Sequence, residues 1–117
     1  MAKKILIIDD DPNIVKYLET LFADNNYETV TATDGANAYD VLVNEKPDLI
    51  TLDLDMPNEW GPRFYRKMTK DDAYKGMPVI VISGLSGSKY AIKNAVASLK
   101  KPFDREELMQ IVKDTIG

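Results

Sequence analysis

Carboxylate, hydroxyl and ammonium side chains stand next to four short hydrophobic runs in this 117-residue chain. The residues are Asp9 with Asp10, Asp53, Ser83 and Lys101. Carboxylates that lie close together repel one another and raise one another's pKa, and a divalent cation removes that repulsion. Mg²⁺ prefers oxygen ligands and commonly binds phosphate oxygens as well. The set therefore indicates a magnesium-dependent site that accepts a phosphoryl group.

Composition narrows the chemistry further. The chain has no cysteine and no histidine, so it has no disulfide framework, no thiolate nucleophile and no imidazole base or metal ligand. Acid–base and metal chemistry must come from carboxylates, hydroxyls and lysines. The formal net charge of −4 argues against binding to a nucleic-acid backbone, since such proteins usually carry a basic surface.

Length and hydrophobic content predict a single domain over residues 1–117, because 44% hydrophobic residues suffice for one packed core. The apolar run near the N-terminus is too short for a secretory signal, and no later segment has the length of a membrane span. We therefore expect a cytoplasmic protein with no membrane contact.

Short aliphatic runs alternate with longer segments of helical periodicity, a pattern typical of β–α units. The runs at 5–8, 49–52 and 79–82 lack the in–out alternation of a half-exposed strand. Strands buried on both faces of a parallel sheet have this pattern, so helices should cover both faces. Ligands of such a sheet bind outside the carboxyl ends of its strands, where the polar residues are predicted to converge.

Capping residues, prolines and apolar spacing predict the other elements. They are helices over 12–24, about 36–44, from near 62, about 89–95 and after 104, and strands over 28–32 and from near 96. Asp11 and Asp104 are the predicted N-caps of the first and last helices. The chain is thus predicted to alternate five strands with five helices.

The motifs resemble those of the receiver domains of bacterial two-component response regulators, among them the chemotaxis receivers. The matching stretches cover residues 5–12, 33–35, 47–57, 61, 78–84 and 101–103. The resemblance implies a flavodoxin-like α/β fold, a doubly wound five-stranded parallel sheet with strand order 2-1-3-4-5. It also implies a phosphoacceptor signalling domain of a phosphorelay, not an enzyme that turns over a substrate.

The resemblance assigns Asp53 as the phosphoacceptor, which attacks a phosphohistidine of a histidine kinase or of a histidine phosphotransfer protein. Lys101 and the hydroxyl of Ser83 would contact the phosphoryl group, and Gly84 would leave room beside Ser83. Phosphorylation would then change the surface that an unidentified downstream protein reads. A homodimer that depends on phosphorylation is left open.

A metal site is implied at the same strand ends, with Mg²⁺ as the expected ion and Mn²⁺ as an alternative. Asp10 would bind the ion directly, Asp9 through a water molecule and Asp53 through a carboxylate oxygen. Asp55 would contribute its backbone carbonyl. The ion and Lys101 would together neutralise the phosphoryl oxygens in the transition state.

The sequence departs from the family pattern between Ser83 and Lys101, where several residues are missing. Ser98 also stands three positions before Lys101, where the family usually has an aromatic switch residue. We therefore expect phosphorylation to be read through a rearranged segment over 84–96 with a shortened helix, and not through an aromatic rotamer.

Trp60 is the single tryptophan and precedes Gly61 near the start of the third helix. It is interpreted either as a ring that covers apolar surface or as a partner-contacting anchor or gate over the site. Gly61 and Pro57 are interpreted as residues that set the shape of the loop.

Three alternatives stay open at this point. The Asp53-Leu54-Asp55 pair resembles the Asp-x-Asp motif of haloacid-dehalogenase phosphatases, although that motif occupies an early strand of a larger chain. A flavodoxin-like FMN carrier would share the fold, but its phosphate loop needs hydroxyls and backbone N–H groups where this chain has three aspartates, 9–11. A receiver-like interaction module that is not phosphorylated is the third alternative.

Overall fold

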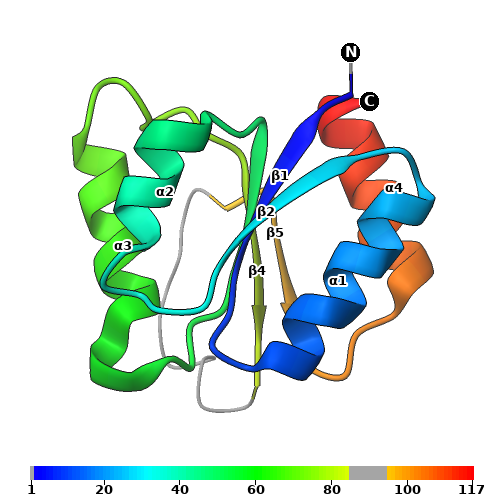
Figure 1. Ribbon diagram of the computed structural model, residues 1–117, viewed down its shortest axis with the longest axis horizontal. Coiled ribbons are helices and arrows are strands. Elements are labelled where there is room, and N and C mark those ends of the chain that lie inside the picture. The colour runs from blue at the N-terminus through cyan, green and yellow to red at the C-terminus, as the bar shows by residue number, and fades with distance from the viewer. Residues whose placement is uncertain (1, 85–94) are drawn as a thin grey trace.

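The protein's computed structural model describes residues 2–84 and 95–117 and has three layers, with helices on both sides of one sheet (Figure 1). The sheet is parallel and its strand order is β2-β1-β3-β4-β5. Its strands are β1 (Lys4–Ile8), β2 (Glu28–Ala32), β3 (Leu49–Leu52), β4 (Val79–Ser83) and β5 (Ala97–Lys100). The predicted doubly wound sheet with the order 2-1-3-4-5 is confirmed.

Four α-helices among the described residues cover the sheet. They are α1 (Pro12–Asp24), α2 (Ala38–Glu45), α3 (Trp60–Lys70) and α4 (Arg105–Ile116), and a 3₁₀ turn, η1 (Pro57–Glu59), precedes α3. In Figure 1, α2 and α3 lie on one side of the sheet and α1 and α4 on the other. The helices therefore cover both faces, as the uninterrupted hydrophobic strands predict.

The strand β1 contributes to the core on both sides of the sheet, because successive side chains of a strand point to opposite faces. Leu6 and Ile8 pack in the cluster under α2 and α3, whereas Ile5 and Ile7 pack in the cluster under α1 and α4. Burial of one such side chain stabilises the fold by about 1.5–3 kcal/mol. This burial holds the ends of the strands in place, and with them the polar residues that follow.

Several predicted boundaries are confirmed. The first helix and the second strand have the bounds that the sequence predicts. The Asp11 carboxylate accepts a hydrogen bond from the backbone N–H of Asn13 at 2.9 Å, and the Asp104 carboxylate accepts one from Glu106 at 2.8 Å. Both predicted N-caps therefore satisfy a free N–H group in the first turn of their helix.

Two helices begin at other residues than predicted. The helix α2 begins at Ala38, two residues later, because the Asp34 carboxylate accepts a hydrogen bond from the N–H of Ala36 at 2.8 Å and holds a turn before the helix. The helix α3 begins at Trp60, two residues earlier, because η1 leads directly into it. Pro62 then lies in the first turn, where a backbone N–H group has no acceptor within the helix, so proline costs no helical hydrogen bond.

The region after β4 is only partly described. The last strand begins at Ala97, one residue after the predicted start. The helix predicted over about 89–95 falls almost wholly on residues 85–94, which lie outside the described residues. None of the helices in the described ranges has the length and apolar character needed to cross a membrane.

Candidate functional site

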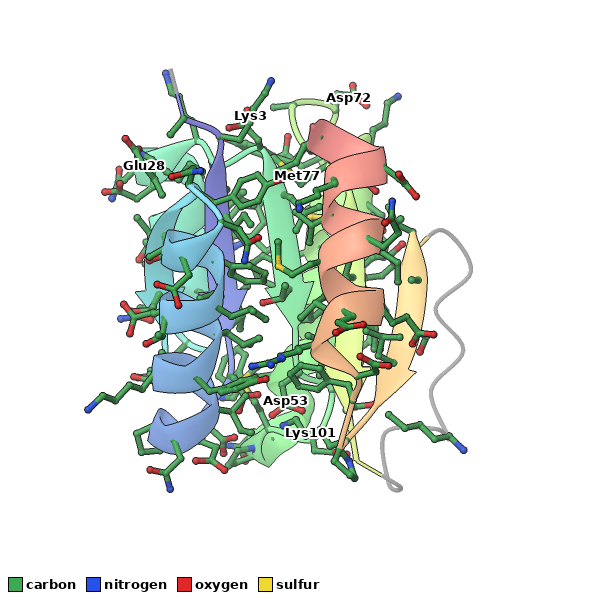
Figure 2. All side chains as sticks on the ribbon, turned by 90° about the vertical axis from the view of Figure 1, so that its right-hand side faces the viewer. Lys3, Glu28, Asp53, Asp72, Met77 and Lys101 are labelled. Carbon is green, nitrogen blue, oxygen red and sulfur yellow. The ribbon has the colours of Figure 1, made fainter. Side chains whose placement is uncertain are left out.

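The polar residues singled out in the sequence lie at the carboxyl ends of four neighbouring strands. Asp9 and Asp10 follow β1, Asp53 follows β3, Ser83 ends β4 and Lys101 follows β5. Two backbone hydrogen bonds join these ends, from Asp53 N–H to the carbonyl of Ile8 at 2.9 Å and from Lys101 N–H to the carbonyl of Ser83 at 2.8 Å. Figure 2 shows Asp53 and Lys101 together at this end of the sheet.

Three of these residues form a cluster of carboxylates. One carboxylate oxygen from each of Asp9, Asp10 and Asp53 lies within 4.8 Å of the other two. Asp9 and Asp53 are each only 2% exposed, whereas Asp10 is exposed. Oxygen ligands that are partly buried and partly open to water fit Mg²⁺, which keeps several of its water ligands. The residues present therefore fit a hard divalent cation.

The two buried carboxylates are oriented by backbone hydrogen bonds. Asp9 Oδ1 accepts a hydrogen bond from the N–H of Asp11, and Asp53 Oδ1 accepts one from the N–H of Asp55, both at 2.9 Å. Each carboxylate thus has one oxygen held by its own loop. The second oxygen of each points to another group, since Lys101 Nζ lies 3.0 Å from Asp9 Oδ2 and 3.6 Å from Asp53 Oδ2.

Lys101 contributes a positive charge to the site. Burial by itself lowers the pKa of an ammonium group, but the hydrogen bond to Asp9 and the charges of Asp53, Asp9 and Asp55 outweigh it, so the pKa of Lys101 lies above its usual value. Lys100, the preceding residue, is exposed, as alternation along the strand predicts. Among the described residues, one ammonium group faces several carboxylates, so these side chains together carry an excess of negative charge.

The pKa of Asp53 departs far from its ordinary value. Burial raises the pKa of Asp53 from its ordinary 3.8 to about 7, and the charge of Asp9 acts in the same direction. The backbone hydrogen bond from Asp55 and the charge of Lys101 act in the opposite direction without cancelling the effect. A cation bound beside Asp53 would favour its ionised form and so make it a better nucleophile.

Asp55 has a contact that the sequence interpretation did not include. Its carboxylate accepts a hydrogen bond from the backbone N–H of Gly84 at 2.5 Å, in addition to the carbonyl assigned to the metal. A Cβ atom on Gly84 would lie 2.9 Å from the same carboxylate oxygen. A side chain at position 84 would therefore require the Asp55 carboxylate to shift. Asp55 is 29 positions away, and no local pattern could identify it as a partner.

Ser83 lies at the site and is only 5% exposed. Its backbone is placed between two site residues, because its own carbonyl accepts from Lys101 and the next N–H donates to Asp55. The end of β4 is thereby tied to the loops after β3 and β5.

The loop that carries Asp53 packs directly against the start of α3. A Cβ atom on Gly61 would overlap the backbone oxygen of Asp53 and would lie 2.7 Å from Cα of Leu54. Gly61 therefore sets the shape of the loop, because only a residue without a side chain permits this approach.

Trp60, next to Gly61, covers the loop after β2. A Cβ atom on Gly35 would overlap the Trp60 Cβ, and the indole packs against the core beneath α2 and α3. Trp60 also lines a cavity of about 220 Å³ together with Asp10 and Asp34. The interpretation of Trp60 as a ring over apolar surface is confirmed, and the ring also lies beside the acidic cluster.

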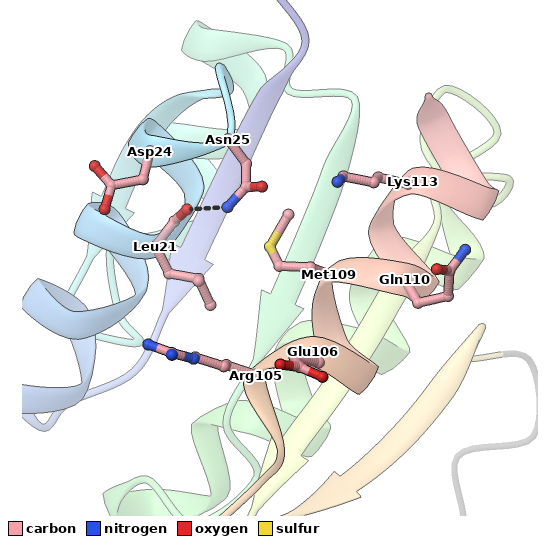
Figure 3. Close-up of a pocket in the computed structure, with 8 residues that line it drawn as sticks. All are labelled: Leu21, Asp24, Asn25, Arg105, Glu106, Met109, Gln110 and Lys113. Carbon is pink, nitrogen blue, oxygen red and sulfur yellow. Dashed lines mark hydrogen bonds between the residues drawn. The ribbon is translucent and has the colours of Figure 1, made fainter.

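A larger cavity, of about 420 Å³, lies between α1 and α4 (Figure 3). It is bordered by charges of both signs, with Asp24 and Glu106 near Arg105 and Lys113. The side-chain amide of Asn25 donates to the carbonyl of Leu21 at 2.8 Å in its wall. None of the clustered carboxylates lines this cavity, so it is separate from the candidate site.

Comparison with known proteins gives concordant matches. A model of the response regulator receiver domain matches residues 5–113. Protein Rrf1 of Nitratidesulfovibrio vulgaris is 36% identical over 112 residues, which cover 96% of this chain and 81% of that protein. Sporulation initiation phosphotransferase F of Bacillus subtilis is 31% identical over 117 residues, covering 97% of this chain and 93% of that protein.

Solved structures agree with the sequence matches. The crystal structure of a response regulator signal receiver domain from Bermanella marisrubri is similar with a TM-score of 0.88 and 28% identity, and the similarity covers 100% of both chains. Some relatives are longer, and the chain spans 26% of the length of two matching transcriptional regulatory proteins.

Proposed function

The chain belongs to the response regulator receiver domain family and is a phosphoacceptor signalling domain of a two-component system, and we propose that Asp53 accepts the phosphoryl group. One observation carries this proposal: Asp53 is a buried carboxylate that lies within 4.8 Å of two other carboxylates and 3.6 Å from Lys101. The family match favours this function over an FMN carrier or a phosphatase. The unphosphorylated module is the alternative that experiment must exclude.

The proposed reaction is a direct phosphoryl transfer. A carboxylate oxygen of Asp53 attacks the phosphorus of a phosphohistidine, a P–O bond forms, the P–N bond breaks, and the imidazole nitrogen keeps the electron pair. Lys101 is proposed to move from its contacts with Asp9 and Asp53 to the oxygens of the phosphoryl group. Asp9, Asp10, Asp53 and the Asp55 carbonyl would hold Mg²⁺, or Mn²⁺ in its place, which supplies charge that neutralises the phosphoryl oxygens.

Ser83 is proposed as the switch hydroxyl. Receiver domains act with histidine kinases or phosphotransfer proteins, and one of these is the proposed phosphodonor. When the Ser83 hydroxyl turns to a phosphoryl oxygen, the strand end that Gly84 ties to Asp55 must adjust. The change would pass into the segment 84–96, of which 85–94 lie outside the described residues, and from there to a downstream protein or a second copy of the chain.

The function is tested by incubating the protein with acetyl phosphate and Mg²⁺ and measuring its intact mass. One phosphoryl group should be added to the native chain and none to an Asp53→Asn variant, and chelation of Mg²⁺ should prevent the addition. If the native chain gains no phosphoryl group, or if the variant gains one equally well, the assignment of Asp53 is wrong.

A further inference from the structure

The helix α3 presents a row of exposed cations that the phosphoacceptor site does not use. The row, called the basic stripe below, consists of Arg63, Arg66, Lys67 and Lys70. Residues three and four positions apart lie on one side of a helix, so these four side chains share one face. The helix contains no acidic residue, although the whole chain has a net charge of −4. The stripe is therefore a local concentration of positive charge on an acidic protein.

A cavity of about 240 Å³ lies beside the basic stripe, between α2 and α3. Aromatic rings of Tyr39, Trp60 and Phe64 line it. The rings of Tyr39 and Phe64 meet edge to face, with their centroids 5.9 Å apart. The Arg63 Cζ lies 5.3 Å from the centroid of the Trp60 ring, and the Lys67 Nζ lies 4.2 Å from the centroid of the Tyr39 ring. The cavity and the basic stripe therefore form one continuous surface, which we name the α2–α3 surface.

The cations of this surface remain available to a partner. Arg63 and Lys67 are exposed although their charged groups rest on aromatic rings. Within the side chains that the structure describes, no ion pair joins any residue of the basic stripe to a carboxylate. Lys67 also attracts the carboxylate of Asp71, to which the Tyr39 hydroxyl donates, although the two charges form no ion pair. Contact with a ring orients a cation without neutralising it, so the charges of the basic stripe can still bind an anion.

We propose that the α2–α3 surface binds an acidic segment of a partner protein that inserts one aromatic or large aliphatic side chain into the cavity. A cavity of 240 Å³ is smaller than the roughly 300–1,000 Å³ typical of small-molecule sites, and it suits a single side chain. Carboxylates on one face of a partner helix would match the spacing of the basic stripe. The buried anchor would supply most of the affinity and the charges would supply orientation.

The surroundings favour a protein segment over a nucleic acid. Asp10 and Asp34 lie at the Trp60 end of the surface, and Asp71 and Asp72 follow the basic stripe at its other end. From Arg63 to Lys70 the stripe is roughly 10 Å long at the rise of an α-helix. A phosphate backbone that continued past either end would meet carboxylates and be repelled. A short acidic helix fits between them.

The test uses a synthetic helical peptide with four glutamates at spacings of three and four residues and one phenylalanine on the same face. Two control peptides replace the glutamates by glutamine or the phenylalanine by alanine. Amide chemical shifts of the isotope-labelled protein, without phosphodonor, should change in α2 and α3. Each control peptide should bind at least about tenfold more weakly, since both charge and anchor contribute.

A matched pair of variants separates this surface from general electrostatics. Arg63→Glu with Lys67→Glu should weaken peptide binding at least about tenfold, whereas Lys16→Glu with Lys113→Glu, an equal charge change on α1 and α4, should alter it less than about twofold. The proposal is overturned if the peptide shifts residues outside α2 and α3, or if it causes no shifts at millimolar concentration. It is also overturned if both variants lose the same affinity, or if a single-stranded oligonucleotide binds these residues more tightly than the peptide. Self-association that covers these residues at NMR concentrations would overturn it in favour of a second copy.

Discussion

At the scale of single residues, the acceptor carboxylate is held in a balance of opposing charges. Burial and Asp9 favour the neutral form of Asp53, whereas Lys101 and the backbone N–H of Asp55 favour the ionised form. The first pair of effects is larger, and its result is a pKa of about 7 for Asp53. A bound cation would reverse the balance, which links metal binding to the nucleophile's charge.

Asp53 is expected to make a contribution to stability that falls as pH rises when no divalent cation is present. The folded pKa of Asp53, about 7, lies above its ordinary 3.8, so the folded state binds this proton more tightly than the unfolded state. The contribution of Asp53 therefore lowers stability progressively between about pH 4 and pH 7 and is constant above. Asp53→Asn stays neutral and should be more stable at pH 8 by on the order of 1–3 kcal/mol, and by less at pH 5.

Urea denaturation in EDTA, repeated with Mg²⁺, measures this effect. Mg²⁺ should stabilise the native chain more than the Asp53→Asn variant, because it binds the folded carboxylates. Asp72→Asn, on the surface, is the control and should change stability by less than about 0.5 kcal/mol at either pH. The stability advantage of the Asp53→Asn variant over the native chain should be larger at pH 8 than at pH 5. The opposite order would contradict burial as the dominant influence on the pKa of Asp53.

At the scale of elements, the loop after β3 and the start of α3 behave as one unit because they are in backbone contact at Gly61. Gly61→Ala should destabilise the fold by about 2–4 kcal/mol. The new Cβ would overlap the backbone oxygen of Asp53 and the Cα of Leu54, and a backbone atom cannot move without displacing the loop. Gly76→Ala is the matched control, because a Cβ at that position meets nothing within 4 Å.

The difference between the two glycine variants is measured by their urea midpoints. Equal midpoints would show that the loop adjusts without cost. In the expected case, the Gly61→Ala variant should also accept phosphoryl groups from acetyl phosphate more slowly, because the displaced backbone is that of Asp53.

Trp60 connects the same loop with the loop after β2, and its fluorescence should report cation binding. The ring shares a cavity with Asp10, one of the clustered carboxylates. Titration with Mg²⁺ should therefore change the emission of this single tryptophan in a saturable way. The Asp10→Asn variant should lose the response at the same concentrations, and a response that survives in that variant would place the cation elsewhere.

At the scale of the whole molecule, signalling must pass from the end of the sheet to a surface. Ser98 is exposed on β5, so no aromatic ring occupies the position at which the family usually has its switch. Hydrogen exchange with beryllium fluoride and Mg²⁺, compared with Mg²⁺ alone, should therefore change most in the segment 84–96. Unchanged exchange in that segment, with beryllium fluoride bound, would contradict a signal carried by the segment 84–96.

Much of this molecule was predictable because its signals are local. Uninterrupted aliphatic runs predicted the buried parallel strands, and Asp11 and Asp104 predicted helix starts that the structure confirms. The parallel sheet then requires the residues after the strands to converge, and Asp9, Asp10 and Asp53 do so. These features depend on side-chain type and spacing along a few residues of chain.

Contacts between distant segments were decided only by the tertiary structure. The bond from Gly84 to Asp55, the approach of Gly61 to Asp53 and the surface formed by Tyr39 with Lys67 join residues that no local pattern relates. Their geometry depends on how the loops pack after the core has formed. The sequence by itself therefore determined the fold, the family and the candidate acidic site, whereas packing decided the charge balance at Asp53 and the joining of α2 and α3 into the α2–α3 surface.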